Sequence, residues 1–231
     1  MPSGVPAPPE STFSRPAPLI GAPVDKVSPG PGSQQLWGVH QQSVRAERSA
    51  HDVAVVDVRI VATHKFSEAE LHALRDLLDE TFEGSFTDDD WDHTVGGLHV
   101  LAVEDGGIVS HAAVVERLLM AADRPLRTGY VEGVATALEH RGRGHASTVM
   151  RAIGKLIRGS YELGGLSTWL PDFYARLGWE LWRGPTYTSS PGGPQRTAED
   201  DGGVMVLRAR STQQLETTRP LMCDWRSGDV W

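Results

Sequence analysis

Two arginines and two glycines alternate in the run Arg141-Gly-Arg-Gly144, between a segment typical of a strand and a segment typical of a helix. The first turn of a helix has unpaired backbone N–H groups and the positive end of the helix dipole. Glycines let an anion reach those N–H groups, and arginines add formal positive charge. The pattern predicts a pyrophosphate site, with a plain tight turn as the alternative. The spacing of nucleotide-hydrolase phosphate loops is absent.

Acidic residues form two further runs, Asp88, Asp89, Asp90 and Asp92 in one and Glu199, Asp200 and Asp201 in the other. Carboxylates that line a cleft attract a polycation and hold its amines by charge-assisted hydrogen bonds. The alternative is a solvated loop, and Asp88 in addition has a position that favours a helix N-terminus.

The nine histidines and the single cysteine predict no site of their own. His93, His99 and His111 lack the ligand spacing of a metal centre, so we expect no metal. Cys223 has no histidine partner that the sequence supports as a nucleophilic pair, and one cysteine excludes a disulfide framework.

Composition narrows the class of protein further. The chain has 231 residues, of which 39% are hydrophobic and 23% charged, with a formal net charge of -8. No run of 18 apolar residues indicates a membrane span, and no basic and apolar start indicates a secretory signal, so we expect a cytoplasmic protein. The negative charge argues against a nucleic-acid partner.

The first 50 residues differ in composition from the rest. Nine of the 15 prolines fall within residues 1–31, with no apolar periodicity, so we predict a flexible extension over residues 1–50 and one domain over residues 51–231. A mistaken upstream start codon would produce the same pattern. The extension carries a net charge of +1, which leaves -9 on the remaining 181 residues.

Strand and helix signals alternate after residue 52. Ser67-Glu-Ala-Glu70 has the form of a helix capping box, a second helix start stands at Thr87, and Glu104-Asp-Gly-Gly107 is a hairpin signal. Helices are expected over residues 68–82, after 87, over 145–157 and over 171–177. Strands are expected over residues 53–62, 98–103, 108–115, 127–135, 166–168, 179–182 and 204–208. The mixture predicts one domain of the α/β or α+β class.

Two of these segments resemble the GCN5-related N-acetyltransferases (GNAT). Arg141-Gly-Arg-Gly-His-Ala146 is similar to the family's R/Q-x-x-G-x-G/A signature, and the segment from Phe173 to Trp179 resembles its "FY-x-x-x-GW" segment. The resemblance implies the GNAT fold, a central mixed β-sheet flanked by helices, with acetyl-coenzyme A as co-substrate and no metal. It implies that the coenzyme binds at Val134, Ala135, Thr136, Arg141, Gly142, Arg143, Gly144, His145 and Ala146.

The resemblance narrows to the aminoglycoside 2'-N-acetyltransferases on the segments 87–97, 129–135 and 221–231, and it covers residues 53–231. It implies acetylation of the 2'-amino group of aminoglycoside antibiotics, resistance to them, and a possible homodimer. Two alternatives stay open, an acetyltransferase for another cellular amine and a non-catalytic module that binds polycations.

The same resemblance assigns roles to individual residues. Glu132 is the expected base, acting through ordered water, and its alternative is a strand carboxylate that faces solvent. Tyr174 is the expected general acid, and its alternative is a packing aromatic. Substrate contacts are implied for Ser85, Asp90, Glu132, Gly133, Ser167, Glu199, Asp200, Asp229 and Trp231 with its free carboxylate. Ser85 stands where the resembling enzymes can have aspartate, so one anionic contact is expected to be lost or weakened.

Overall fold

The computed structural model describes residues 56–231, and the predicted extension over residues 1–50 lies outside the described residues. The helices are α1 (Glu68–Thr81), α2 (Asp88–Thr94), α3 (His145–Ser160) and α4 (Pro171–Ala175). The strands are β1 (Asp57–Ala62), β2 (Leu98–Glu104), β3 (Gly107–Ala121), β4 (Arg124–Thr136), β5 (Leu163–Ser167), β6 (Glu180–Leu181), β7 (Thr186–Ser190), β8 (Gly193–Arg196), β9 (Val204–Arg208) and β10 (Leu221–Asp224).

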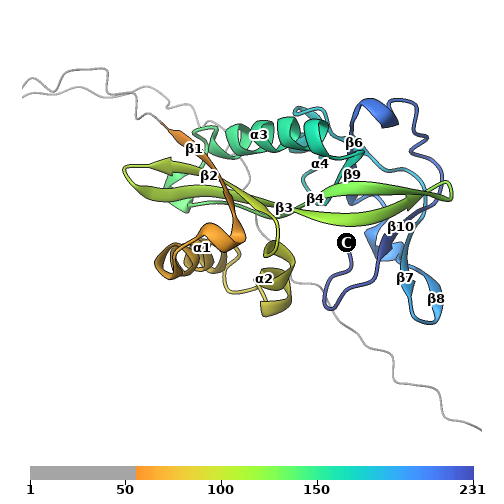
Figure 1. Cartoon of the computed structure of the whole chain (residues 1–231), viewed down its shortest axis with the longest axis horizontal. Helices are drawn as coiled ribbons and strands as arrows, with labels where there is room; N and C mark the ends of the chain where they lie inside the picture. The colour runs from red at the N-terminus through yellow and green to blue at the C-terminus, as the bar shows by residue number, and fades with distance from the viewer. Residues whose placement is uncertain (1–55) are drawn as a thin grey trace, which may run out of the picture.

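Within residues 56–231 the strands form one mixed sheet of ten strands, with helices on both faces (Figure 1). Its main path runs β6-β9-β5-β4-β3-β10-β7-β8, and β2 pairs with both β1 and β3. Helix α3 covers one face, while α1 and α2 lie on the other (Figure 1). The predicted mixed α/β class is confirmed.

Helices α1 and α2 begin where the sequence predicts. Ser67 and Thr87 each cap a helix, and the side chains of Glu70 and Asp90 accept the backbone N–H of the capping residue in return. These reciprocal bonds satisfy N–H groups that a helix start would otherwise leave unpaired. The apolar side of α1 packs on the sheet through fully buried Leu74 and Leu78.

The predicted hairpin between β2 and β3 is confirmed, since Asp105 and Gly106 both have positive φ, as a tight two-residue turn requires. Strands β3 and β4 are longer than predicted and form a second hairpin through Ala122 and Asp123, also at positive φ. Its far end pairs with β10, near the end of the chain.

Helix α3 begins directly after Gly144, which has φ 87°. Val149, Ile153 and Ile157 recur at helical spacing and are fully buried against the sheet. Trp179 and Trp182 are buried and belong to the core. Among residues 56–231, no helix is long and apolar enough to span a membrane.

Strand β4 makes two departures from regular pairing. It pairs with parallel β5 only from Thr128 to Tyr130. On its other side the register with β3 shifts between His111 and Ala113, so that β4 has a bulge at Gly133, whose φ is 57°. A bulge re-aims neighbouring side chains, and glycine takes the required conformation without strain.

Candidate functional site

The loop from Arg141 to Gly144 is open to an anion. Gly142 and Gly144 have φ of 74° and 87°, and no described atom lies within 4 Å of a Cβ built on either. No side chain among the described residues caps α3, so its first backbone N–H groups remain for a ligand. Arg141 Nε donates to the Thr136 carbonyl at 3.3 Å, which braces the loop on β4. The loop therefore fits a pyrophosphate.

The neighbouring predicted coenzyme residues follow β4 into this loop. Ser110 Oγ donates to the Ala135 carbonyl and is hydrogen-bonded to Thr136 Oγ1, both at 2.8 Å, on the β3 side. On the opposite side, β4 from Val131 to Thr136 has no strand partner within the described part of the chain. An extended ligand can bind along this open edge through backbone hydrogen bonds, as an added strand would. Of His145, only the backbone N–H remains for the anion, because the imidazole is buried.

Two buried histidines support the bulge. His111 Nδ1 lies 2.7 Å from the Gly133 carbonyl, and His111 Nε2 lies 2.9 Å from His99 Nδ1. His99 Nε2 lies 2.9 Å from Thr63 Oγ1. The four groups form a chain of hydrogen bonds from the bulge to the turn after β1.

The direction of every bond in this chain follows from its end. A carbonyl only accepts, so His111 Nδ1 carries the proton and His111 Nε2 accepts. His99 therefore donates from Nδ1, and the Thr63 hydroxyl donates to His99 Nε2. Burial lowers the pKa of His99 to about 4 and that of His111 to about 3, with His99 adding to the effect on His111. Both imidazoles are neutral at pH 7, as the chain requires.

Glu132 precedes the bulge and is paired with the C-terminal segment. Its Oε1 lies 2.5 Å from Arg226 Nη1, and the side chains are only 15% and 14% exposed. The alternative of a carboxylate that faces solvent is therefore wrong. Arg226 Nε also donates to the Asp229 carbonyl at 2.7 Å, which holds the turn of the C-terminal segment.

The C-terminal segment from Leu221 to Trp231 folds back beneath the sheet, on the face that carries α2 (Figure 1). His93 of α2 is hydrogen-bonded to the Ser227 carbonyl at 2.9 Å. A Cβ on Gly228 would stand 2.8 Å from Asp89 Cβ, so the segment lies directly on α2. Trp231 is buried and its indole N–H donates to Thr197 Oγ1 at 2.9 Å.

Three predicted substrate residues come together in one open cavity. Glu199, Asp200 and Asp229 line a cavity of about 270 Å³, with Thr197 and Trp225 among its other residues. Glu199 is exposed and Asp200 is buried. Ser167 lies close by, because Thr168 N donates to the Gly203 carbonyl and Gly203 N donates to the Asp200 carbonyl. The cavity can therefore hold a cationic ligand against carboxylates from two distant segments.

Three further carboxylates of the two acidic runs, those of Asp88, Asp90 and Asp201, have structural partners. Asp90 Oδ2 accepts the backbone N–H and the hydroxyl of Thr87, both at 2.8 Å, in the capping box of α2. Asp88 pairs with Arg75 at 3.0 Å, although its side chain is 96% exposed. Arg196 pairs with Asp201 and lowers the pKa of that carboxyl. Ser85 Oγ donates to the Phe82 carbonyl at 2.6 Å, a contact that an aspartate could not donate.

Tyr174 lies in the core cluster that also contains Val131 of β4 and Leu166 of β5. Its side chain is buried, and its hydroxyl is hydrogen-bonded to Thr168, just beyond the end of β5. Burial raises the pKa of Tyr174 far above its usual value, so the phenol keeps its proton at neutral pH. The burial agrees with the alternative of a packing aromatic, and the role as general acid stays a prediction.

Arg226 and the His99–His111 pair are site residues that the sequence did not predict. Arg226 and Glu132 are 94 positions apart in the chain, and no local sequence pattern predicts their pairing. The two histidines face each other only because β2 and β3 are in register there.

Comparisons with known proteins agree with this geometry. The model of the acetyltransferase (GNAT) domain matches residues 62–182. A protein named aminoglycoside 2'-N-acetyltransferase, from Mycolicibacterium fortuitum, is 42% identical over 177 residues, which cover 75% of this chain and 91% of that protein.

Among the solved structures compared, one with a TM-score above 0.5 shows the same fold. The GNAT family N-acetyltransferase YhbS from Escherichia coli, in complex with CoA, is 16% identical with a TM-score of 0.55 over 76% of this chain and 93% of its own. A GCN5-related N-acetyltransferase from Kribbella flavida is 24% identical with a TM-score of 0.47 over 56% of this chain. The present chain spans 34% of the length of the Kribbella protein.

The buried histidines predict a dependence of stability on pH. In the unfolded chain, His99 and His111 bind protons below about pH 6.5. In the folded protein, His99 binds a proton only near pH 4 and His111 only near pH 3. Because the unfolded state binds more protons between these pH values, acid lowers the free energy of unfolding. In His111→Leu the slope of that free energy against pH should be smaller by up to about 1.4 kcal/mol per pH unit. Urea unfolding at several pH values measures it.

The matched control is His72→Leu, because His72 lies on the exposed side of α1, where its imidazole is in water. The control should keep the slope of the parent protein. If the free energy of unfolding has the same slope against pH in the parent and in His111→Leu, the two buried histidines are not neutral in the folded protein.

Proposed function

Because the chain belongs to the GNAT acetyltransferase family, and within it to the aminoglycoside 2'-N-acetyltransferases, we propose that it transfers the acetyl group of acetyl-coenzyme A to the 2'-amino group of aminoglycosides. The observation that carries the substrate assignment is the acidic cavity. Glu199 and Asp200 meet Asp229 there, beside the buried final residue of the chain. An aminoglycoside is a polycation, and such a cavity raises its local concentration and orients its amines.

The coenzyme side of the proposal uses separate residues. The pyrophosphate binds at the loop from Arg141 to Gly144 and the first turn of α3. Uncapped backbone N–H groups and the guanidinium groups of the loop provide hydrogen-bond donors and positive charge there. The pantetheine lies along the unpaired edge of β4, from Val134 to Thr136. Positive charge at the loop and negative charge at the cavity keep the two substrates apart except where they react.

The reaction takes place where the two substrates meet, beside Glu132. The amine must lose a proton before its nitrogen attacks the thioester carbonyl. Glu132 takes this proton, through ordered water as the family resemblance implies. The new C–N bond forms, the C–S bond breaks, and the leaving thiolate takes a proton from Tyr174. The nitrogen then releases its second proton to become the amide, and this proton restores the Tyr174 phenol. Burial keeps that phenol protonated until then.

Arg226 fits this scheme as a positioning residue. It holds the Glu132 carboxylate in one place through its 2.5 Å contact, and through Asp229 it links that carboxylate to the cavity. Substrate ammonium groups can take the place of the guanidinium as partners of the carboxylate. Cytoplasmic location, a homodimer and a role in antibiotic resistance stay predictions of the sequence and the family resemblance.

The substrate assignment predicts a simple selectivity. Coenzyme A release from acetyl-coenzyme A should occur with tobramycin, gentamicin or kanamycin B, which carry a 2'-amino group, and not with an aminoglycoside that carries a 2'-hydroxyl. The measurement is steady-state thiol release. The assignment would be wrong if a compound without the 2'-amino group is turned over and the compounds that carry this group are not. Higher efficiency on a small cellular amine would favour the alternative substrate class.

The role of Glu132 predicts the effect of Glu132→Gln. Loss of the base should lower kcat about 100-fold or more, while the binding of acetyl-coenzyme A stays unchanged. The matched control is Glu116→Gln, the same substitution at an exposed glutamate of β3, and this variant should keep the parent rate. A Glu132→Gln enzyme that is folded, binds both substrates and turns over at the parent rate would remove Glu132 as base.

The role of the chain end predicts the effect of one alanine added after Trp231. The addition moves the terminal carboxylate by one residue, about 3.8 Å along the chain. The KM for the aminoglycoside should rise, by about tenfold if one charge-assisted contact is lost, with the KM for acetyl-coenzyme A unchanged. The same alanine added at the N-terminus is the control. Unchanged KM values in both proteins would exclude the terminal carboxylate as a substrate contact.

A further inference from the structure

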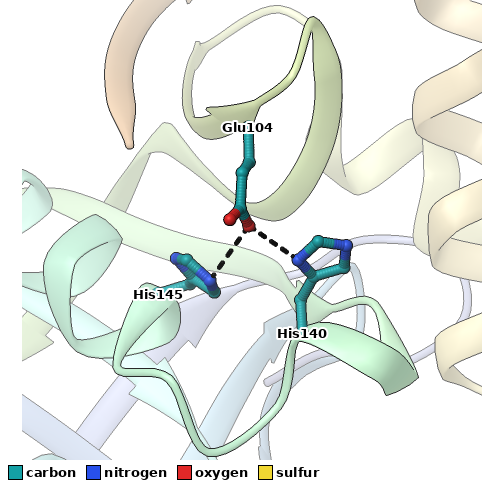
Figure 2. Close-up of side chains that lie close together, drawn as sticks. All are labelled: Glu104, His140 and His145. Atoms are coloured by element: carbon teal, nitrogen blue, oxygen red, sulfur yellow. Dashed lines mark hydrogen bonds and ion pairs between the residues drawn. The ribbon is translucent and has the colours of Figure 1, made fainter. Parts of the chain in front are cut away.

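A carboxylate and two imidazoles meet behind the proposed pyrophosphate loop (Figure 2). Glu104 is the last residue of β2, His140 lies just before the loop, and His145 is the first residue of α3. Figure 2 shows the Glu104 side chain pointing between the two imidazole rings. One donor atom from each residue lies within 4.8 Å of the other two.

The distances are close to those of a metal site. Glu104 Oε2 lies 2.8 Å from His140 Nδ1 and 3.7 Å from His145 Nε2. Ligands at zinc-like bond lengths of about 2.0–2.1 Å stand about 3.3 Å apart at the corners of a tetrahedron. The observed separations lie on both sides of that value, so small side-chain movements bring all three donors to a common ion.

One of the three donors lacks a hydrogen-bond partner. His145 Nε2 is buried, and within residues 56–231 nothing lies at hydrogen-bond distance from it. The side chain is only 6% exposed, and this nitrogen points toward the Glu104 carboxylate without reaching it. A buried, unpaired polar atom is unfavourable and calls for a partner. His140 is 20% exposed, so the cluster is accessible to an ion from solvent.

We propose that Glu104, His140 and His145 bind one divalent transition-metal cation of the zinc class, with water at the fourth position. Two imidazoles and one carboxylate suit zinc, cobalt or nickel, whereas magnesium and calcium favour oxygen ligands. Arg143 Nη1 lies 3.8 Å from Glu104 Oε2 and competes for this carboxylate. The Arg143 side chain is 53% exposed, so it can leave the carboxylate to the metal and turn to an anion outside.

The metal connects two parts of the fold that the coenzyme site needs. It joins the end of β2 to both sides of the loop between β4 and α3. With neutral imidazoles, the three side chains carry a charge of -1 without the metal and +1 with it. The bound cation therefore strengthens coenzyme A binding at the adjacent loop; this coupling rests on the proposed function, whereas the metal site itself does not.

The proposal departs from the sequence-based expectation of no metal. His140 and His145 are five positions apart, and Glu104 lies 36 positions before His140, which matches no short ligand motif. Only the packing of the β2–β3 hairpin against the start of α3 brings them together.

Titration of the full chain with Co²⁺ tests the metal site directly, without substrate or turnover. We expect one equivalent to bind, with the visible absorption of four-coordinate cobalt, and Zn²⁺ to displace it. Glu104→Gln, His140→Gln and His145→Gln should each weaken binding by at least about tenfold. His72→Gln, an exposed histidine of α1, is the control and should bind as the parent does.

No binding by the folded parent protein, or equal binding by the parent and the three variants, would overturn the metal site. Circular dichroism identifies variants that fail to fold. If a histidine variant fails to fold, the near-isosteric Glu104→Gln variant still tests the metal site. Failure of the acetyltransferase assay leaves the cobalt spectrum unaffected, so the two proposals fail separately.

Calorimetry of coenzyme A binding tests the coupling. Zn²⁺ should tighten coenzyme A binding to the parent, by about tenfold if one nearby charge interaction is gained. In Glu104→Gln, Zn²⁺ should have no effect, and the metal-free variant should bind coenzyme A more tightly than the metal-free parent. Coenzyme A affinity that is the same with and without bound Zn²⁺ would overturn the coupling.

Discussion

Strand β4 cannot pair with two neighbours along its whole length and also offer a backbone edge to a substrate. It resolves this by leaving β5 after Tyr130, while β3 stays paired beyond the bulge. At the bulge, the Gly133 carbonyl accepts its hydrogen bond from the side chain of His111. Glu132, the open edge and the anion-binding loop all follow along this one strand, so their relative positions depend on its irregular pairing.

The end of the chain completes the site from the opposite side. Strand β10 is held between β3 and β7, and the residues after it turn back onto α2. Arg226 reaches Glu132, and Trp231 inserts into the core with its indole on Thr197. Because Trp231 is buried, truncation of the chain removes core packing and cavity wall together.

Local signals in the sequence predicted much of the fold. The capping boxes at Ser67 and Thr87, the Asp105-Gly106 turn and the apolar repeat of α3 depend on residues within a few positions of each other. Strands β7, β8 and β10 were not predicted, since each is only four or five residues long, and the pairing of β7 with β10 joins segments far apart in the chain. Asp90 shows the limit of residue type alone, because the same carboxylate that the family resemblance assigns to substrate also caps α2.

The sequence by itself determined the chemistry that is encoded locally. It specified an anion-binding loop at a helix start, an acidic domain and the motifs that identify the family, because each depends on neighbouring residues. Only the tertiary structure decided which charges meet. It paired Glu132 with Arg226, joined Asp229 to Glu199 and Asp200, and set Glu104 against His140 and His145. These contacts join residues far apart in the chain, and their energies depend on burial and distance, which exist only once the sheet has formed.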